Sequence, residues 1–161
     1  MNAVILYYTK TGHTLEAISP IAQALQEKGV STNIVLAKDF DSTALNDIDI
    51  FIVGTPCWGG SSGITGVATP IQKALKKINS NALEKVKCFG VAVHAKYGGE
   101  ATLNHLEKLL KNHGAVGMVK APIAKAGVLT SIVKGKSVTP QDEQILYDFA
   151  ESSISDLNKR L

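Results

Sequence analysis

The sequence predicts an α/β domain in which helices cover both faces of a parallel sheet. Short apolar runs alternate with segments of helical spacing along the whole 161-residue chain. The runs are almost entirely apolar, as in strands buried on both faces. Such an alternation is typical of parallel strands joined by right-handed helical crossovers. The length suits one domain, residues 1–161.

Three strands and one helix are predicted in the first third of the chain. Residues 3–8 (AVILYY) form an apolar, β-prone run. A helix follows and ends at Gly29. Its apolar stripe is expected to be Leu15, Ile18, Ala22 and Leu25. Residues 31–37 and 48–55 are the second and third predicted strands.

Pro20 falls inside the first predicted helix, where proline removes a backbone hydrogen bond. Either the helix kinks there, or Ser19 caps a new helix that starts at Pro20. The apolar stripe continues through Pro20, which favours the kink.

The middle of the chain continues the pattern. A helix is predicted over residues 70–78, with Thr69 as its N-cap and Pro70 at the first helical position. Residues 86–94 form the fourth predicted strand. The third helix ends near Gly114 and carries Leu103, Leu106, Leu109 and Leu110.

The C-terminal part holds one predicted strand, residues 115–119, and one helix that opens at Thr139–Pro140. The side chains expected to face inward from this helix are Ile145, Leu146, Phe149, Ile154 and Leu157. Between them, residues 120–138 mix apolar residues with Lys and Gly. That stretch either extends the last strand or forms an excursion.

Three loops should carry the chemistry. In parallel sheets, ligands bind beyond the carboxyl ends of the strands, where the strand order reverses. The loops that follow the first, third and fourth strands are therefore the informative ones. They are TKTGHT (residues 9–14), PCWGGSSG (56–63) and HAKYGG (94–99), here named the first, second and third loops.

The first loop has the composition of a phosphate cradle. The hydroxyls of Thr9, Thr11 and Thr14 can donate to phosphate oxygens, and Gly12 lets the backbone turn. The helix behind the loop adds unpaired N–H groups and the positive end of its dipole. The spacing matches neither a Walker A loop nor GxGxxG. Taken alone, the loop is equally compatible with Thr14 capping a helix and the other two threonines facing solvent.

The second and third loops each contain one aromatic residue. Trp58, the one tryptophan of the chain, lies between Cys57 and two glycines, and Tyr97 precedes two glycines. Aromatic side chains at such positions can stack on a flat ligand, although a tryptophan also often covers a sheet edge. Together, the three loops indicate a site for a planar, phosphorylated cofactor.

These motifs resemble those of the flavodoxin family of FMN-binding redox proteins. VILYYTKTGHTLEAI is similar to the family's strand–loop–helix signature, GTPCWGG to its second loop, and HAKYGG to its third. The resemblance extends over almost all of residues 1–161. It implies a flavodoxin-like three-layer sandwich, with a five-stranded parallel sheet in the order 2-1-3-4-5 and FMN as cofactor.

The resemblance also implies which residues bind the cofactor. The phosphate would be held by Thr9, Lys10, Thr11, Gly12, His13 and Thr14. The flavin ring would be bordered on one side by Pro56, Cys57, Trp58, Gly59 and Gly60. Its other side would be lined by His94, Ala95, Lys96, Tyr97, Gly98 and Gly99. We expect no catalytic residue and no metal ligand in these loops.

The charges around this site differ from those of many flavodoxins, which are acidic there. The three loops contain no Asp or Glu and carry Lys10, His13, His94 and Lys96. Positive neighbours favour an anionic reduced flavin, so the second reduction potential should be higher than in acidic relatives. The same charges favour acidic partner proteins or anionic molecules such as NAD(P)H.

Composition excludes other classes of function. The net charge is +3 and the single arginine is Arg160, so we expect no nucleic-acid partner. No apolar run approaches the about 18 residues that span a bilayer, and no leader segment is expected at the N-terminus. Cys57 and Cys88 form no CxxC motif, which favours a protein of the reducing cytoplasm.

Several individual residues admit two interpretations. Cys57 is either a redox-active thiol beside the flavin or a small loop residue, and the second is favoured because no cysteine lies near it in sequence. The acids that flank the second and third strands could hold a metal, but turn and cap roles are commoner. These acids are Asp39, Asp41, Asp47 and Asp49.

Three functions are compatible with the sequence. The favoured one is a flavodoxin-like electron carrier that binds FMN and exchanges electrons with redox partner proteins. The first alternative is an FMN-dependent oxidoreductase of the NAD(P)H:quinone type. The second is a flavodoxin-like scaffold that has lost FMN. The absence of an isolated catalytic acid or nucleophile in the loops favours the carrier.

Overall fold

The computed structural model describes residues 1–57, 66–94, 98–125 and 138–158. Within them a parallel sheet has the strand order β2-β1-β3-β4-β5. Its strands are β1 (Asn2–Tyr7), β2 (Ser31–Leu36), β3 (Ile50–Pro56), β4 (Lys87–His94) and β5 (Met118–Lys120). The predicted fold class and strand order are confirmed.

The fifth strand is interrupted by a bulge. A short strand β6 (Ala124–Lys125) also pairs in parallel with β4, beyond β5. From Gly90 to Val93 β4 advances three residues, while the facing chain advances four, from Lys120 to Ala124. One extra residue therefore sits between the two pieces, as in a β-bulge. The last strand thus begins later than predicted and extends to Lys125, the first of the two alternatives considered for this stretch.

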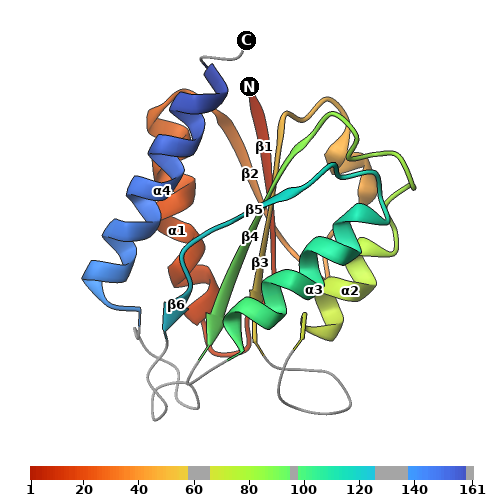
Figure 1. The fold of residues 1–161 in the computed structure, drawn as a ribbon. Helices are drawn as coiled ribbons and strands as arrows, with labels where there is room; N and C mark the ends of the chain where they lie inside the picture. The colour runs from red at the N-terminus through yellow and green to blue at the C-terminus, as the bar shows by residue number, and fades with distance from the viewer. Residues whose placement is uncertain (58–65, 95–97, 126–137, 159–161) are drawn as a thin grey trace.

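Helices form two layers around the sheet (Figure 1). α1 (His13–Glu27) and α4 (Pro140–Asn158) lie on one side, and α2 (Thr69–Leu75) and α3 (Gly99–Lys111) on the other. A short 3₁₀ helix, η1 (Ser42–Leu45), follows β2. Two apolar clusters fill the spaces between the layers, and the buried faces of β1, β3 and β4 contribute to both. Among the described residues, no helix combines the length and apolar character needed to cross a bilayer.

α1 runs through Pro20 as one continuous helix, so a new helix start at that position is wrong. Ile18, Ala22 and Leu25 are buried as predicted, but Leu15 is 39% exposed. Leu15 lies in the first turn, beside His13 and Thr14, which are buried instead.

α4 shows the same pattern. Leu146 and Ile154 are buried and Phe149 packs against the core, whereas Ile145 is 41% exposed. The inward orientation predicted for Ile145 is therefore wrong, because the helix presents Leu146 instead. The side chain of Leu157 lies outside the described residues.

The boundaries of α2 differ from the prediction. α2 begins at Thr69, with Ala68 as its N-cap, so Thr69 is not the cap, and the helix ends at Leu75. α3 ends at Lys111, near Gly114 as predicted. Asp41 also has the predicted cap role, since its carboxylate accepts the Thr43 N–H at 2.8 Å at the start of η1.

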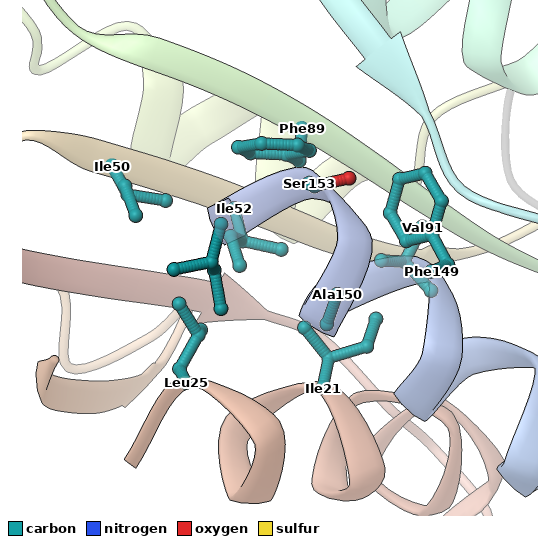
Figure 2. A pocket seen from close by; sticks show the side chains of 10 residues that line it. Ile21, Leu25, Ile50, Ile52, Phe89, Val91, Phe149, Ala150 and Ser153 are labelled. Carbon is teal, nitrogen blue, oxygen red and sulfur yellow. The ribbon is translucent and has the colours of Figure 1, made fainter. Parts of the chain in front are cut away.

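A narrow apolar crevice of about 10 Å³ remains between α1, α4 and the sheet. Figure 2 shows Ile21 and Leu25 of α1 facing Ile52 of β3 and Phe149 of α4 across it. Its lining is apolar apart from Ser153, so it lacks the several converging polar groups that orient a ligand. We regard it as a packing gap and place the functional site elsewhere.

Candidate functional site

The three predicted loops leave the same edge of the sheet. All strand pairs are parallel, so their carboxyl ends meet at one edge, here called the carboxyl edge. Tyr7 at the end of β1 pairs with Gly54 near the end of β3, and Pro56 pairs with Val93 of β4. The first, second and third loops start at this edge. Six of the predicted residues, Trp58, Gly59, Gly60, Ala95, Lys96 and Tyr97, lie outside the described residues.

Gly12, within the first loop, opens α1. Gly12 is the N-cap, with φ of 102° in the left-handed region, and no side chain caps the helix. The first helical hydrogen bond runs from the Glu16 N–H to the Gly12 carbonyl at 3.0 Å. Geometry therefore leaves the N–H groups of the first turn without an intrahelical acceptor. A Cβ built on Gly12 meets nothing within 4 Å, so open space lies beside the turn.

Thr9 shapes this loop from within. Its hydroxyl oxygen accepts the Gly12 N–H at 2.9 Å, which closes a tight turn between the strand and the helix. A hydroxyl that accepts one bond can still donate its own proton. The loop therefore combines a hydroxyl donor, backbone N–H groups and a helix N-terminus, the donor set that suits a phosphate.

The next two residues of the loop are buried. His13 is 4% exposed and Thr14 is 2% exposed. A Cβ built on Gly54 would approach the Thr14 Cγ2 atom to 3.2 Å and the Ile18 Cγ2 atom to 2.8 Å. Glycine at position 54 therefore lets the start of α1 pack directly on β3. Contacts of the Thr14 hydroxyl and the His13 ring with a ligand stay predictions.

α3 begins in the same way at the third loop. Its N-cap is Gly98, with φ of 97°, and again no side chain caps the helix. Ile123, in the bulge between β5 and β6, packs closely against the start of α3. A Cβ built on Gly99 would lie 2.5 Å from the Ile123 Cγ2 atom. Two helices, α1 and α3, thus open at the carboxyl edge with left-handed glycines and uncapped ends.

Cys57 follows β3 and anchors the second loop. Its N–H donates to the Val93 carbonyl at 2.8 Å, and its side chain packs with Ala92 and Leu103. Burial raises the pKa of the Cys57 thiol, and the Thr102 hydroxyl offsets only part of that shift. A buried, protonated thiol is a poor nucleophile, which supports its interpretation as a small loop residue.

Val67 and Ala68, which follow the second loop, are held by polar contacts. The Ala68 N–H donates to the Thr55 hydroxyl at 3.1 Å, and the Val67 carbonyl accepts from the Gln72 amide at 2.6 Å. The Val67 N–H also points to Nδ1 of His105 on α3, 3.5 Å away. The chain on both sides of the second loop is therefore fixed to β3, β4 and α3.

The exposed charges at the carboxyl edge are mixed, with basic residues in excess. Lys10 and Lys38 are exposed after β1 and β2, and Lys125 is exposed at the end of β6. Asp39 and Glu100 are exposed at the same edge. Among the described residues, the first and third loops carry no carboxylate, as the sequence indicates.

Glu16 is a residue of this region that motif spacing does not identify. It lies two residues beyond the first loop, and one of its carboxylate oxygens is 3.6 Å from Nδ1 of His13. The other accepts the Val138 N–H at 3.1 Å, across 122 residues of sequence. An acidic residue in the first turn is usual for a helix, so the sequence offers no signal for this second contact.

Comparison with known proteins agrees with the fold. The family model described as Flavodoxin matches residues 5–145. The probable flavodoxin 1 of Bacillus subtilis (strain 168) is 31% identical over 89 residues. That match spans 55% of this chain and 55% of the relative, about half the length of each.

Solved structures share the same fold at lower identity. The flavodoxin of Streptococcus pneumonia TIGR4 superposes with a TM-score of 0.70 at 19% identity, over 97% of this chain and 99% of the other. The rubredoxin oxygen:oxidoreductase of Desulfovibrio gigas has a TM-score of 0.73 at 16% identity, over 98% of this chain but 36% of the other. The family match over most of the sequence, joined to the strand order and the glycine-capped first loop, leads to one conclusion. The chain belongs to the flavodoxin family, FMN-binding flavoproteins of electron transport.

Proposed function

We propose that this protein binds FMN at the carboxyl edge and carries electrons between redox partner proteins. The observation that carries the proposal is the pair of helix starts at Gly12 and Gly98, both left-handed and uncapped, beside a loop rich in hydroxyls. A helix end without its own cap has N–H groups to offer a ligand. Two other helices start near this edge: α4 is capped by its own Thr139, and α2 follows Ala68, which has no side-chain cap and no left-handed glycine.

The residues of the first loop would hold the phosphate of FMN. Thr9 can donate its hydroxyl proton while it accepts the Gly12 N–H, and the N–H groups that follow Gly12 point out of the helix end. Residues that border the second and third loops would place the ring, with Cys57 and Gly98 fixing where those loops start and end. Bound FMN supplies one- and two-electron chemistry.

We infer that partner proteins dock at the carboxyl edge and carry acidic surfaces. Lys10, Lys38 and Lys125 are exposed there and outnumber Asp39 and Glu100. Complementary charge raises the association rate more than the affinity. The two free cysteines, both buried, support a site of action in the reducing cytoplasm.

Reconstitution with FMN tests the proposal. Purified protein should take up FMN and show the visible spectrum of a bound flavin. It should then accept electrons from an NADPH-dependent reductase protein and pass them to a second protein, at a rate that falls as salt rises. Protein that stays colourless after incubation with FMN would support the scaffold alternative and contradict the proposal.

The enzyme alternative predicts a different result in a second assay. An NAD(P)H:quinone-type oxidoreductase oxidises NAD(P)H with quinone when no reductase protein is present, whereas a carrier does not. The variants Lys38→Glu and Lys125→Glu sharpen the assay. They should slow electron transfer from an acidic protein partner, and a Lys85→Glu variant, at the opposite end of the sheet before β4, serves as the matched control.

A further inference from the structure

One carboxylate joins the first loop to the start of α4. Glu16 contacts His13 through one oxygen at 3.6 Å and accepts the Val138 N–H through the other at 3.1 Å. His13 belongs to the first loop, and Val138 stands two residues before α4. Glu16 is thus the point at which the loop and the C-terminal helix meet.

Both contacts are shielded from water. His13 is 4% exposed and Val138 is 2% exposed, and the side chain of Glu16 is 21% exposed. A buried backbone N–H needs an acceptor, and an ionised carboxylate is a strong one. Removing the carboxylate would leave the Val138 N–H without this acceptor, so the start of α4 or the first turn of α1 would have to move.

A second carboxylate ties the C-terminal end of α1 to the middle of α4. Glu27, in the last turn of α1, accepts from the Tyr147 hydroxyl and from the Gln23 amide, and the Lys28 ammonium pairs with Glu151 at 2.7 Å. Both ends of α1 are therefore fastened to α4. Glu16 lies at the end of α1 that opens at Gly12, whereas Glu27 lies at the end away from the first loop.

We propose that Glu16 is a positioning residue for the phosphate of FMN. It holds His13 and the start of α4 against the first turn of α1, so that the first loop keeps its shape only while α4 is docked. The inference rests on the proposed function, since it concerns the same site. It adds a coupling between phosphate binding and the docking of α4.

Charge alone predicts the opposite effect for Glu16. A carboxylate near the helix end repels a phosphate dianion, so any neutral substitution should strengthen FMN binding by the same factor. If Glu16 instead positions the first loop, different neutral substitutions should change FMN affinity by different amounts. Glu16→Gln keeps an oxygen that can accept the Val138 N–H, while Glu16→Ala keeps none. Glu16→Asp keeps the charge but shortens the side chain by one methylene.

The experiment compares FMN with riboflavin, which is FMN without its phosphate. Apoprotein of the wild type and of E16Q, E16A and E16D is titrated with each flavin, and quenching of flavin fluorescence gives the two dissociation constants. The ratio of the FMN dissociation constant to the riboflavin dissociation constant measures the contribution of the phosphate to binding. We expect E16A to bind FMN about tenfold more weakly than E16Q, as for the loss of one hydrogen bond. Their riboflavin constants should agree within about twofold.

E27A is the matched control, because it loosens α4 at the end of α1 away from the first loop. It should lower the melting temperature without changing the ratio of the two dissociation constants. E16D should bind FMN more weakly than the wild type despite its charge, and it keeps the test decisive even if E16A does not fold.

Two outcomes count against the inference in distinguishable ways. If the wild type binds FMN, but E16A matches E16Q in the ratio and E16D matches the wild type, the positioning role is overturned and the proposed function stands. If the wild type binds neither flavin, the proposed function fails and the inference falls with it.

Discussion

Two helix starts lie side by side in this protein and are built in opposite ways. α4 opens at Thr139, whose hydroxyl oxygen accepts the Asp142 N–H at 3.1 Å and whose proton goes to the Asp142 carboxylate at 3.0 Å. α1 opens at Gly12, which has no side chain to cap the helix. The two starts are joined by the bond from Val138 to Glu16.

The difference separates a helix end that serves the fold from one that can serve a ligand. α4 satisfies the N–H of Asp142 in its first turn with its own Thr139 hydroxyl. α1 follows a loop with three threonines, yet its N-cap is Gly12 and no side chain caps it. A helix start of this kind suits an anionic ligand. α3, opened by Gly98, repeats the arrangement of α1.

The largest effect is expected at Gly12. Alanine there has space for its Cβ but must adopt φ near 102°, a region that disfavours side chains. We expect Gly12→Ala to weaken FMN binding by more than about tenfold, because relaxing about 1–2 kcal/mol of strain would move the loop. Fluorescence titration with FMN measures the effect.

Gly29 provides the control for this prediction. It ends the same helix with φ of 75°, and a Cβ there also meets nothing within 4 Å. Gly29→Ala should destabilise the protein to a similar extent and leave FMN affinity almost unchanged. Equal losses of FMN affinity in the two variants would mean that the start of α1 has no special role.

A smaller pair of effects should distinguish the threonines of the two helix starts. Thr139→Ala removes the cap of α4 and should cost about 1 kcal/mol of unfolding free energy, with little change in FMN affinity. Thr9→Ala removes the acceptor of the Gly12 N–H and should weaken FMN binding more than it lowers stability. Urea unfolding of the apoprotein and FMN titration measure both quantities. If Thr139→Ala and Thr9→Ala changed stability and FMN affinity to the same extent, the proposed difference between the two helix starts would be wrong.

The smallest effect concerns pH and the far end of α1. The Tyr147 hydroxyl, and then the Gln23 amide, lower the pKa of Glu27 below its usual 4.5. A lowered folded-state pKa stabilises the protein above the unfolded-state pKa, and the gain disappears as pH falls through the folded value. The melting temperature of the wild type should therefore exceed that of Glu27→Gln at neutral pH, and the difference should shrink as the pH falls below 4.5. If the difference in melting temperature persisted in acid, it would have to come from packing and not from the charge of Glu27.

Much of the fold follows from local patterns in the sequence. The apolar runs at residues 3–8 and 48–55 locate β1 and β3 within two residues, and Thr139–Pro140 marks the start of α4. These features depend on neighbouring residues alone. The glycine and threonines of the first loop likewise identify the start of α1 as a candidate phosphate site.

Other features depend on residues distant in sequence and could not be read from it. The bulge between Lys120 and Ala124 exists only relative to the register of β4. The exposure of Leu15 and Ile145 depends on which neighbours cover the ends of α1 and α4, which helical spacing does not specify. The bond from Val138 to Glu16 requires that two helices far apart in the chain pack together.

The most direct test of the central claim follows backbone amides by NMR while FMN is added. If the start of α1 holds the phosphate, the largest shifts that FMN causes and riboflavin does not should fall on Gly12, His13, Thr14 and Leu15. The amides at the start of α4, from Thr139 to Asp142, should change much less. Phosphate-dependent shifts centred on α4, or none at α1, would contradict the account.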